Sequence, residues 1–220
     1  EESQEPAEPA YLNTREHDAY IQGNDGRFRP EDSLSRAEAV AMLARLSVDE
    51  QGNLLYSGAP GTGGFSDVKR GDWYAPYVTF AKRYGIANGY LDGTFRPEQP
   101  VSRAELVKLI ASYFTEGGTS PFPDVPDGHW AAEVVSFAAE EGWVSGYPDG
   151  TFRPDAPVSR AEAVKILNHA LDRRAGERAA ALPFTDVEKG HWACDEIREA
   201  AVSHIYRKSG EGETWLTYER

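Results

Sequence analysis

The chain has 220 residues, of which 40% are hydrophobic and 11% aromatic, and it carries a formal net charge of -13 at pH 7. This composition predicts a folded chain, and the charge repels nucleic acid and anionic membrane surfaces, so neither is expected as a partner. No apolar run is long enough for membrane insertion. The single cysteine, Cys194, excludes an intramolecular disulfide and a cysteine-based metal cluster, and leaves the redox compartment open.

The beginning of the chain lacks the features of a folded segment. Residues 1–10 are acidic, contain two prolines and show no hydrophobic periodicity, so they are expected to form a tether outside the fold. The sequence starts with neither an initiator methionine nor a signal peptide. We therefore expect a processed product or an excised region.

An internal repeat dominates the sequence. GYLDGTFRP at 89–97 returns as GYPDGTFRP at 146–154, and a shorter copy, GNDGRFRP, occupies 23–30. Ser-Arg-Ala-Glu follows each copy, at residues 35–38, 102–105 and 159–162. Repeats of this kind predict repeated structural units, and three equivalent surface sites favour a binding module over an enzyme.

A second recurring element is Phe-x-Asp-Val followed by a tryptophan. It begins at Phe65, Phe122 and Phe184. In the middle copy, residues 129–141 have apolar side chains at helical spacing, and Gly142 is placed to end the helix in a left-handed conformation. We interpret the tryptophans as core residues, although a half-exposed ring could also stack on a sugar. They are Trp73, Trp130 and Trp192.

The Ser-Arg-Ala-Glu motif predicts the start of another helix. Its serine is an N-cap, and its glutamate lies three residues later, at capping-box spacing. Each unit should therefore consist of a helix, a loop and a second helix. The chain begins with a loop and capped helix that lack a preceding Phe-x-Asp-Val helix, and it ends with such a helix that lacks its loop. If these two halves complement each other, the array closes as a pseudo-threefold body.

The arginine of the motif stands in the first helical turn, where the helix dipole disfavours a cation by roughly 0.3–1 kcal/mol. Two forms of compensation remain open. One is an ion pair with the loop aspartate or with a carboxylate of a neighbouring unit. The other is an anion bound jointly by the guanidinium and the free amides of the helix start. The three arginines are Arg36, Arg103 and Arg160.

Each loop contains residues with a structural interpretation. An Asp-Gly pair is a turn former, and a phenylalanine is expected to anchor the loop in the core. These residues are Asp25, Asp92 and Asp149, and Phe28, Phe95 and Phe152. Tyr90 and Tyr147 could donate a hydroxyl to a polar ligand, and the first copy has no equivalent. Calcium binding by these loops is an alternative that would need more oxygen ligands than one aspartate per loop.

Signatures of catalysis are missing from the sequence. Paired carboxylates, a nucleophile elbow and His-x-x-x-His spacing are absent, and His129 and His191 are interpreted as residues that precede the repeated tryptophans. We therefore expect no catalytic residue, no metal site and no cofactor.

Together these motifs resemble the S-layer homology (SLH) family, from about Tyr11 to Tyr206. The resemblance implies a mainly α fold in which three helix-loop-helix SLH units close into a pseudo-threefold, spindle-like domain. It also implies non-covalent anchoring of an extracellular protein to the cell wall or S-layer, through pyruvylated secondary cell wall polysaccharide bound in grooves between units. The arginine of a Thr-Arg-Ala-Glu-like motif contacts the glycan in this family, and serine replaces the threonine in all three copies here.

The first copy departs most from the family pattern. Its loop is one residue shorter, its tyrosine is lost and Arg27 replaces the threonine. Its groove is therefore expected to bind weakly or differently. The predicted glycan-binding residues are Arg36, Arg103, Arg160, Asp25, Asp92, Asp149, Trp73, Trp130, Trp192, Tyr90 and Tyr147.

The expected organisation is a tether (1–10), one domain (11–206) and a C-terminal extension (207–220). The units lie around 11–64, 65–121 and 122–183, with 184–206 completing the first. Other S-layer subunits are further possible partners. The alternative function is a structural protein–protein interaction or self-assembly module without direct glycan binding, in which the arginines form internal ion pairs. A targeting domain cut from a larger surface enzyme is also compatible with the sequence.

Overall fold

The computed structural model describes residues 9–62, 64–114, 120–174, 181–209 and 212–218. Two sets of helices alternate along this part of the chain. One set begins at the Ser-Arg-Ala-Glu motifs and comprises α1 (Arg36–Leu46), α3 (Arg103–Ala111) and α5 (Arg160–Ala170). The other follows the Phe-x-Asp-Val motifs and comprises α2 (Ala75–Arg83), α4 (Ala132–Glu140) and α6 (Cys194–Ala201). The predicted mainly helical fold is confirmed.

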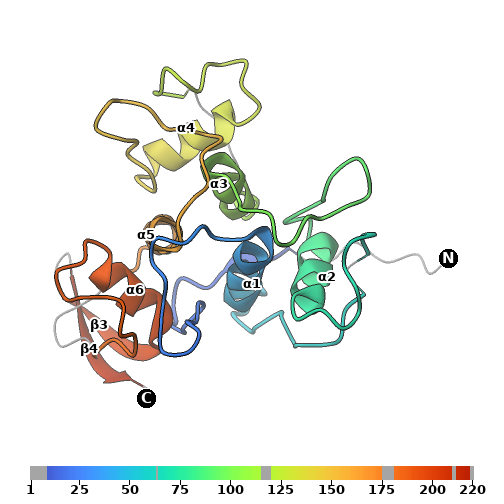
Figure 1. The fold of residues 1–220 in the computed structure, drawn as a ribbon. Helices are drawn as coiled ribbons and strands as arrows, with labels where there is room; N and C mark the ends of the chain where they lie inside the picture. The colour runs from blue at the N-terminus through green and yellow to red at the C-terminus, as the bar shows by residue number, and fades with distance from the viewer. Residues whose placement is uncertain (1–8, 63, 115–119, 175–180, 210–211, 219–220) are drawn as a thin grey trace.

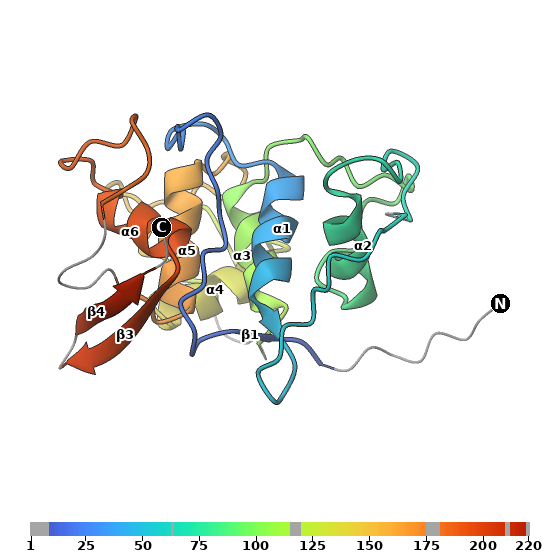
Figure 2. The ribbon, with the colours of Figure 1, turned by 90° about the horizontal axis from the view of Figure 1, so that it is seen from below.

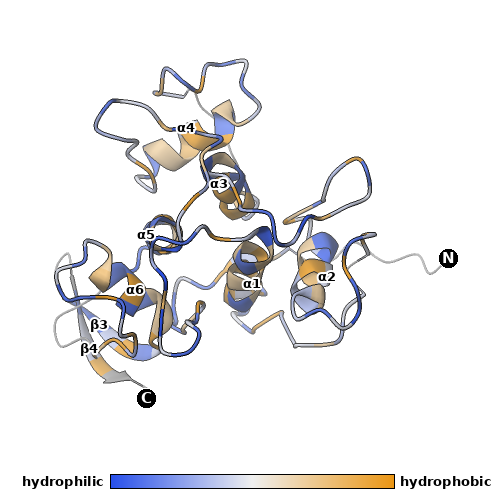
Figure 3. Ribbon diagram, in the orientation of Figure 1, coloured by the Kyte–Doolittle hydropathy of each residue, from blue (hydrophilic) through white to orange (hydrophobic). Residues whose placement is uncertain are grey.

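The two sets of helices occupy different places in the molecule. Helices α1, α3 and α5 lie near the centre in Figure 1, and each has one partner outside it: α2 beside α1, α4 beside α3 and α6 beside α5. Among the central helices, α3 contacts both α1 and α5. Each helix carries both hydrophobic and hydrophilic residues (Figure 3), as expected for helices with one buried face.

The central helices begin with the predicted capping boxes. In α5 the Ser159 hydroxyl accepts a hydrogen bond from the backbone N–H of Glu162 (3.2 Å), and the Glu162 carboxylate accepts one from the Ser159 N–H (2.9 Å). The same reciprocal pair starts α1 and α3. Because each N-cap contributes about 1 kcal/mol, these local signals define where the central helices start.

The middle outer helix begins later than the sequence predicts. Helix α4 starts at Ala132, whereas the predicted helix started at residue 129. The three preceding residues form a turn in which the Ala132 N–H donates to the His129 carbonyl (3.0 Å). The predicted end is confirmed, since Gly142 has a φ of 74°, which favours glycine.

Backbone hydrogen bonds link the three residues that precede the central helices. The Leu34 N–H donates to the Val158 carbonyl (2.9 Å), Val158 to Val101 (3.0 Å) and Val101 back to Leu34 (2.9 Å). All three side chains are fully buried. The segments that enter α1, α3 and α5 are therefore joined in a closed cycle.

The loop phenylalanines anchor the loops in the core, as predicted, and all three are completely buried. Phe152 packs against Phe122 with the ring centroids 5.4 Å apart, and the Asp124 carboxylate accepts hydrogen bonds from the backbone N–H groups of Phe152 (2.9 Å) and Arg153 (2.7 Å). The same arrangement joins Phe65 and Asp67 to the loop of the second copy. Each Phe-x-Asp-Val motif thus holds a Gly-rich loop.

The short strands form two antiparallel pairs. Strand β1 (Tyr11–Leu12) pairs antiparallel with β2 (Ser47–Val48), with Tyr11 opposite Val48. Strands β3 (His204–Ser209) and β4 (Gly212–Tyr218) form a hairpin at the edge of the molecule beside α6 (Figure 2). The expected boundary between residues 206 and 207 falls inside β3, and the expected tether at 1–10 lies mostly outside the described residues.

No helix in the described part of the chain combines the length and apolar character required to cross a bilayer.

Candidate functional site

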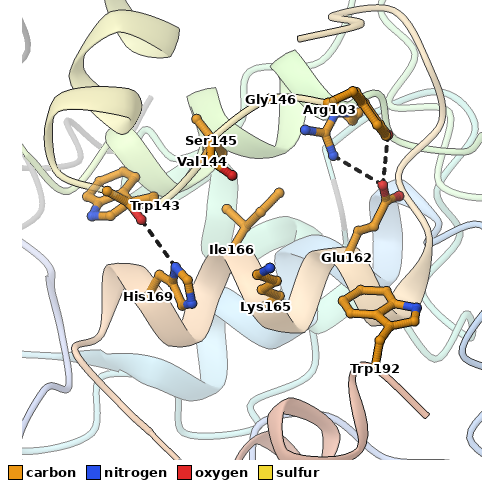
Figure 4. Close-up of a pocket in the computed structure, with 12 residues that line it drawn as sticks. Arg103, Trp143, Val144, Ser145, Gly146, Glu162, Lys165, Ile166, His169 and Trp192 are labelled. Atoms are coloured by element: carbon orange, nitrogen blue, oxygen red, sulfur yellow. Dashed lines mark hydrogen bonds and ion pairs between the residues drawn. The ribbon is translucent and has the colours of Figure 1, made fainter. Parts of the chain in front are cut away.

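Two pockets lie at equivalent positions of the repeat, and each takes its arginine from one unit and its glutamate from the next. The Arg103 pocket (Figure 4) includes Arg103, Tyr147, Glu162, Lys165, His169 and Trp192. The Arg36 pocket includes Arg36, Tyr90, Glu105, Lys108, Ser112 and Trp130. In Figure 4 the side chains of Glu162, Lys165 and His169 project from one side of α5, which makes this helix one wall of the pocket.

The arginine is held by a carboxylate of the neighbouring unit. The Arg103 Nε donates to the Phe152 carbonyl (2.9 Å), and its Nη1 donates to Oε1 of Glu162 (3.3 Å). Arg36 makes the equivalent bonds to Phe95 and Glu105 (3.0 and 3.1 Å). Of the two forms of compensation left open by the sequence, the ion pair with a neighbouring unit is therefore present. Nη2 of both arginines has no hydrogen-bond partner among the described residues, so it can donate to a ligand.

The helix-start amides, by contrast, are already occupied. The Arg103 N–H donates to the Ala156 carbonyl and the Ala104 N–H to the Pro154 carbonyl, both at 3.0 Å, and the Glu105 N–H donates to the Ser102 hydroxyl. The hypothesis that free helix-start amides help to bind an anion is therefore wrong. The next unit's loop satisfies the amides of Arg103 and Ala104, which a single unit considered alone would leave unpaired.

Glu162 organises the polar side of the Arg103 pocket. Its Oε2 accepts the Ser159 N–H of the capping box, and its Oε1 accepts both Arg103 and the Tyr147 hydroxyl (2.8 Å). Burial and the hydrogen bond to Glu162 raise the pKa of Tyr147, so the phenol stays neutral. Tyr90 donates to Glu105 in the same way (3.1 Å). The tyrosine hydroxyls thus fix the glutamates, and the ring of Tyr147 lies 4.7 Å from the Arg103 guanidinium carbon.

A lysine in each pocket was not among the predicted site residues. The Lys165 ammonium lies 5.8 Å from the ring centroid of Trp192, and Lys108 lies 5.3 Å from that of Trp130. The sequence contains a signal for them, because both lysines stand three residues after the glutamate of the motif. The first copy has Ala41 at this position.

The repeated tryptophans are exposed, and their interpretation as core residues is wrong. Their relative exposures are 54% for Trp73, 53% for Trp130 and 54% for Trp192. They lie in the turns before the outer helices rather than on the buried helix faces. Trp192 and Trp130 each line a pocket, whereas Trp73 lines neither of the two.

Asp92 and Asp149 stabilise their own turns, and none of the three loop aspartates lines either pocket. Asp149 accepts hydrogen bonds from the backbone N–H (3.0 Å) and hydroxyl (2.6 Å) of Thr151, and it pairs with Arg153 (2.8 Å). These hydrogen bonds, led by that of the Thr151 hydroxyl, hold the pKa of Asp149 well below its usual range. Asp92 has equivalent partners and a pKa of about 2, while Asp25 adopts a left-handed φ of 52° in the shorter first loop.

The third arginine has a different environment. Arg160 donates through Nε to the Phe28 carbonyl (2.8 Å) and pairs through Nη1 with Glu38, as its equivalents do. Its Nη2, however, donates to the Gln22 carbonyl (2.8 Å). Nη2, which has no partner in Arg36 and Arg103, is therefore hydrogen-bonded in Arg160. This difference agrees with the divergent sequence of the first loop.

The arginine–glutamate pairs form a cycle through the chain. Arg36 pairs with Glu105, Arg103 with Glu162 and Arg160 with Glu38. Together with the cycle of backbone bonds, these pairs define the class of protein. It is a repeat protein in which successive units share side chains at their boundaries, with pockets formed at two of these boundaries.

Comparison with known proteins identifies the repeat. The family model for the S-layer homology domain matches residues 64–107 and 121–164. The chain is 36% identical over 215 residues to Cell surface glycoprotein 1 of Acetivibrio thermocellus, and 33% identical over 208 residues to the Cellulosome-anchoring protein of the same organism, covering 91% of this chain in both cases. It spans 9% and 46% of the lengths of these two relatives. It is also 41% identical over 109 residues, half of this chain, to S-layer protein EA1 of Bacillus anthracis, of which it spans 12%.

Residues 64–107 and 121–164 are therefore two S-layer homology repeats. The names of these three relatives refer to the cell surface, to cellulosome anchoring and to the S-layer, and together with the family model they indicate an extracellular location in the cell wall or S-layer. The first copy of the repeat, which diverges in its loop and in the surroundings of Arg160, lies outside the residues matched by the family model.

Proposed function

We propose that this chain is a non-catalytic module that anchors a surface protein to the cell wall by binding pyruvylated secondary cell wall polysaccharide in the Arg103 and Arg36 pockets. The observation that carries the proposal is the repeated combination of an arginine, a lysine and an exposed tryptophan in both pockets. The printed names of two relatives, a cellulosome-anchoring protein and an S-layer protein, support anchoring as the role.

The charges in the pockets fit an anionic sugar substituent. In each pocket two cations accompany one glutamate, although the chain as a whole carries a formal charge of -13. A pyruvate ketal adds one carboxylate to a sugar ring, and Nη2 of Arg103 can donate a charge-assisted hydrogen bond to it. Lys165 supplies the second cation, and the flat face of Trp192 supplies an apolar surface for the ring.

The proposal assigns different roles to the predicted glycan-binding residues. In the two pockets, Arg36, Arg103, Trp130 and Trp192 contact the glycan. Tyr90 and Tyr147 orient the glutamates, while Asp92 and Asp149 maintain the loops. The third set, with Arg160, Asp25 and Trp73, binds more weakly, because Nη2 of Arg160 is already engaged by Gln22.

We further propose that the three units close into one pseudo-threefold, spindle-like domain that spans about residues 11–206. The last Phe-x-Asp-Val segment completes the first unit, because Asp186 accepts hydrogen bonds from the backbone of Phe28 and Arg29 (2.8 Å each). The Phe184 and Phe28 rings pack at 5.3 Å, as in the other copies. In this arrangement the chain has three units although its sequence begins and ends with half a unit.

The experiment that tests the proposal is calorimetric titration of the chain with purified cell wall polymer, before and after mild acid removes the pyruvate ketals. We expect two binding sites for the intact polymer and loss of binding after ketal removal. Binding that survives ketal removal would assign recognition to neutral sugar rings stacked on tryptophan. Absence of binding to either polymer would contradict the proposal.

The alternative of a self-assembly module without glycan binding predicts a different result. The chain would then self-associate in the absence of polymer, which sedimentation velocity would detect as a concentration-dependent increase in mass. An R36A/R103A double variant separates the two functions. It should lose polymer binding without a change in sedimentation if the pockets bind glycan.

A further inference from the structure

Four buried titratable side chains converge outside both pockets. They are His17, which precedes the first copy of the loop, Glu199 of α6, His204 of β3 and Glu213 of β4. One potential ligand atom from each residue lies within 4.8 Å of all the others. The cluster therefore joins three segments that are remote in sequence.

The distances within the cluster are close to the ligand–ligand distances of a small coordination polyhedron. Nδ1 of His17 lies 3.1 Å from Nε2 of His204 and 3.5 Å from Oε2 of Glu213. Nε2 of His204 lies 3.4 Å from Oε2 of Glu199. With metal–ligand bonds of about 2.0–2.2 Å, neighbouring ligands of tetrahedral Zn²⁺ are separated by roughly 3.3–3.6 Å. The His17–Glu213 and His204–Glu199 distances fall within this range, and the His17–His204 distance is slightly shorter.

Protein groups do not satisfy the carboxylates of this cluster. Both oxygens of Glu199, which is completely buried, and Oε2 of Glu213 lack a hydrogen-bond partner among the described residues. Oε1 of Glu199 approaches Nδ1 of His17 to 2.8 Å, but without the geometry of a hydrogen bond. An unpaired buried carboxylate costs several kcal/mol, so these oxygens require a proton or a cation.

The buried arginine in this region does not provide that cation directly. The guanidinium of Arg173 donates its hydrogen bonds to the backbone carbonyls of Asn13, Glu16 and Asp18. A buried carboxylate that has no cationic protein partner is free to bind a metal ion.

We propose that His17, Glu199, His204 and Glu213 form a structural site for one divalent transition-metal ion, with Zn²⁺ as the ion that fits best. Two imidazoles and two carboxylates are ligands that Zn²⁺ accepts, and two carboxylates neutralise its charge in the buried site. All four residues are buried, which leaves no open position for a substrate and makes the site structural rather than catalytic.

The surroundings of His204 support metal coordination. Its Nδ1 lies 2.9 Å from the Val202 carbonyl, which directs the lone pair of Nε2 towards the other three residues. A metal-bound histidine commonly has its second nitrogen held in this way. The indole of Trp215 stacks on the His204 ring at 3.5 Å, and the ring of Tyr206 stacks on that of His17 at 3.9 Å. Both imidazoles are therefore fixed in place by their neighbours.

The ion would fasten the end of the chain to its beginning. His17 and His204 already pair through their backbones, since the His204 N–H donates to the His17 carbonyl (3.1 Å). A two-residue bridge and a two-stranded hairpin are weak by themselves. A shared ion links them to α6 through Glu199, and so stabilises the hairpin against the helical core.

The test is metal binding by the whole chain. After chelator treatment, the protein is mixed with ZnCl₂, desalted and analysed by elemental mass spectrometry, and a second sample is loaded with Co²⁺. We expect one Zn²⁺ per chain, a higher Tm in the presence of Zn²⁺ and the visible absorption of tetrahedral Co²⁺. The Co²⁺ spectrum uses the unaltered sequence, so its outcome does not depend on whether a variant folds.

Variants locate the ion. Glu213→Gln keeps the size of the side chain and should weaken Zn²⁺ binding by at least about tenfold. Glu31→Gln is the matched control, because Glu31 forms a comparable pair with His191 (3.1 Å) on the surface and should leave affinity unchanged. If the stripped chain binds no Zn²⁺, or if both variants bind it like the original, the cluster is neutralised by protons and the proposal is overturned.

Discussion

The carboxylate of Asp186 accepts a hydrogen bond from the backbone N–H of Phe28 (2.8 Å), 158 residues earlier in the chain. The aspartates of the other two Phe-x-Asp-Val motifs make the same contact within their own repeat, about 28 residues away. The last Phe-x-Asp-Val motif thus holds the first loop through the same hydrogen bond that each of the other two motifs makes to the loop of its own repeat. Stability of the first loop should depend on a residue close to the other end of the chain.

Replacement of Asp186 by Ala should therefore destabilise the protein. The side chain is largely buried and accepts two backbone hydrogen bonds, and each bond to a charged acceptor is worth about 1.5–3 kcal/mol. We expect a loss of at least about 2 kcal/mol in the free energy of unfolding, measured with urea. Asp195→Ala is the control, because Asp195 forms an exposed pair with Arg198 and its loss should have little effect. Equal effects of the two substitutions would contradict this account.

The same contacts should make the fold sensitive to acid. Burial would raise the pKa of Asp186, but hydrogen bonds from Phe28 and Arg29 more than offset this and lower it below the ordinary 3.8. A carboxylate with a lowered pKa contributes stability at pH above 3.8, and this contribution is lost as the pH falls through its value in the folded protein. Urea unfolding at pH 7 and at pH 3 should show the decline, and Asp186→Asn should reduce the difference.

Removal of the pocket lysines should weaken polymer binding. Lys108→Ala and Lys165→Ala together should reduce affinity by about tenfold or more, since each removes a cation beside the proposed carboxylate. Lys69→Ala with Lys189→Ala is the control: both lysines are exposed outside the pockets, and the change in net charge is identical. If calorimetry gives the same loss for both pairs, only the overall charge matters and the pockets do not bind the polymer.

Loss of a pocket tryptophan should mainly reduce polymer binding, whereas loss of a loop phenylalanine should mainly reduce stability. Trp130→Ala and Trp192→Ala should leave the free energy of unfolding within about 0.5 kcal/mol, because the rings are exposed, and should reduce polymer affinity about two- to tenfold. Phe152→Ala should instead cost about 3–5 kcal/mol of stability, since its ring is completely buried. Thermal unfolding combined with titration separates the two effects. Trp73→Ala should change neither stability nor binding much.

The two pockets should respond differently to pH. A hydrogen bond with Glu196 raises the pKa of His169 above the ordinary 6.5, although burial opposes this. As the pH falls through that value, the Arg103 pocket gains a positive charge and should bind an anionic ligand more tightly. The Arg36 pocket has Ser112 at this position and should not change. Titration between pH 8 and 5.5 should show the increase in R36A and not in an R36A/H169S variant.

Local signals made much of the fold predictable. The capping boxes, the glycine that ends α4 and the burial of the loop phenylalanines all follow from spacing within one repeat, and all are confirmed. The tryptophans were misplaced because they stand in turns just before the helices, where helical periodicity does not apply. The start of α4 was misplaced for the same reason.

Features that depend on contacts between units could not be read from the sequence. The amides at the start of α3 looked available, and only the neighbouring loop reveals that Pro154 and Ala156 accept their hydrogen bonds. The proposed metal site was not predicted from the sequence, because His17 and His204 are 187 residues apart. Lys108 and Lys165 were visible as a repeated position, but their significance depends on tryptophans that belong to a different segment.

The division of each pocket among several segments also determines how such a module can be inherited or engineered. The Arg103 pocket takes its arginine from α3, its glutamate and lysine from α5 and its tryptophan from the turn before α6. A single repeat copied into another protein would contain parts of two pockets but no complete pocket. The shortest segment that contains the whole Arg103 pocket therefore runs from Arg103 to Trp192, which is longer than one repeat.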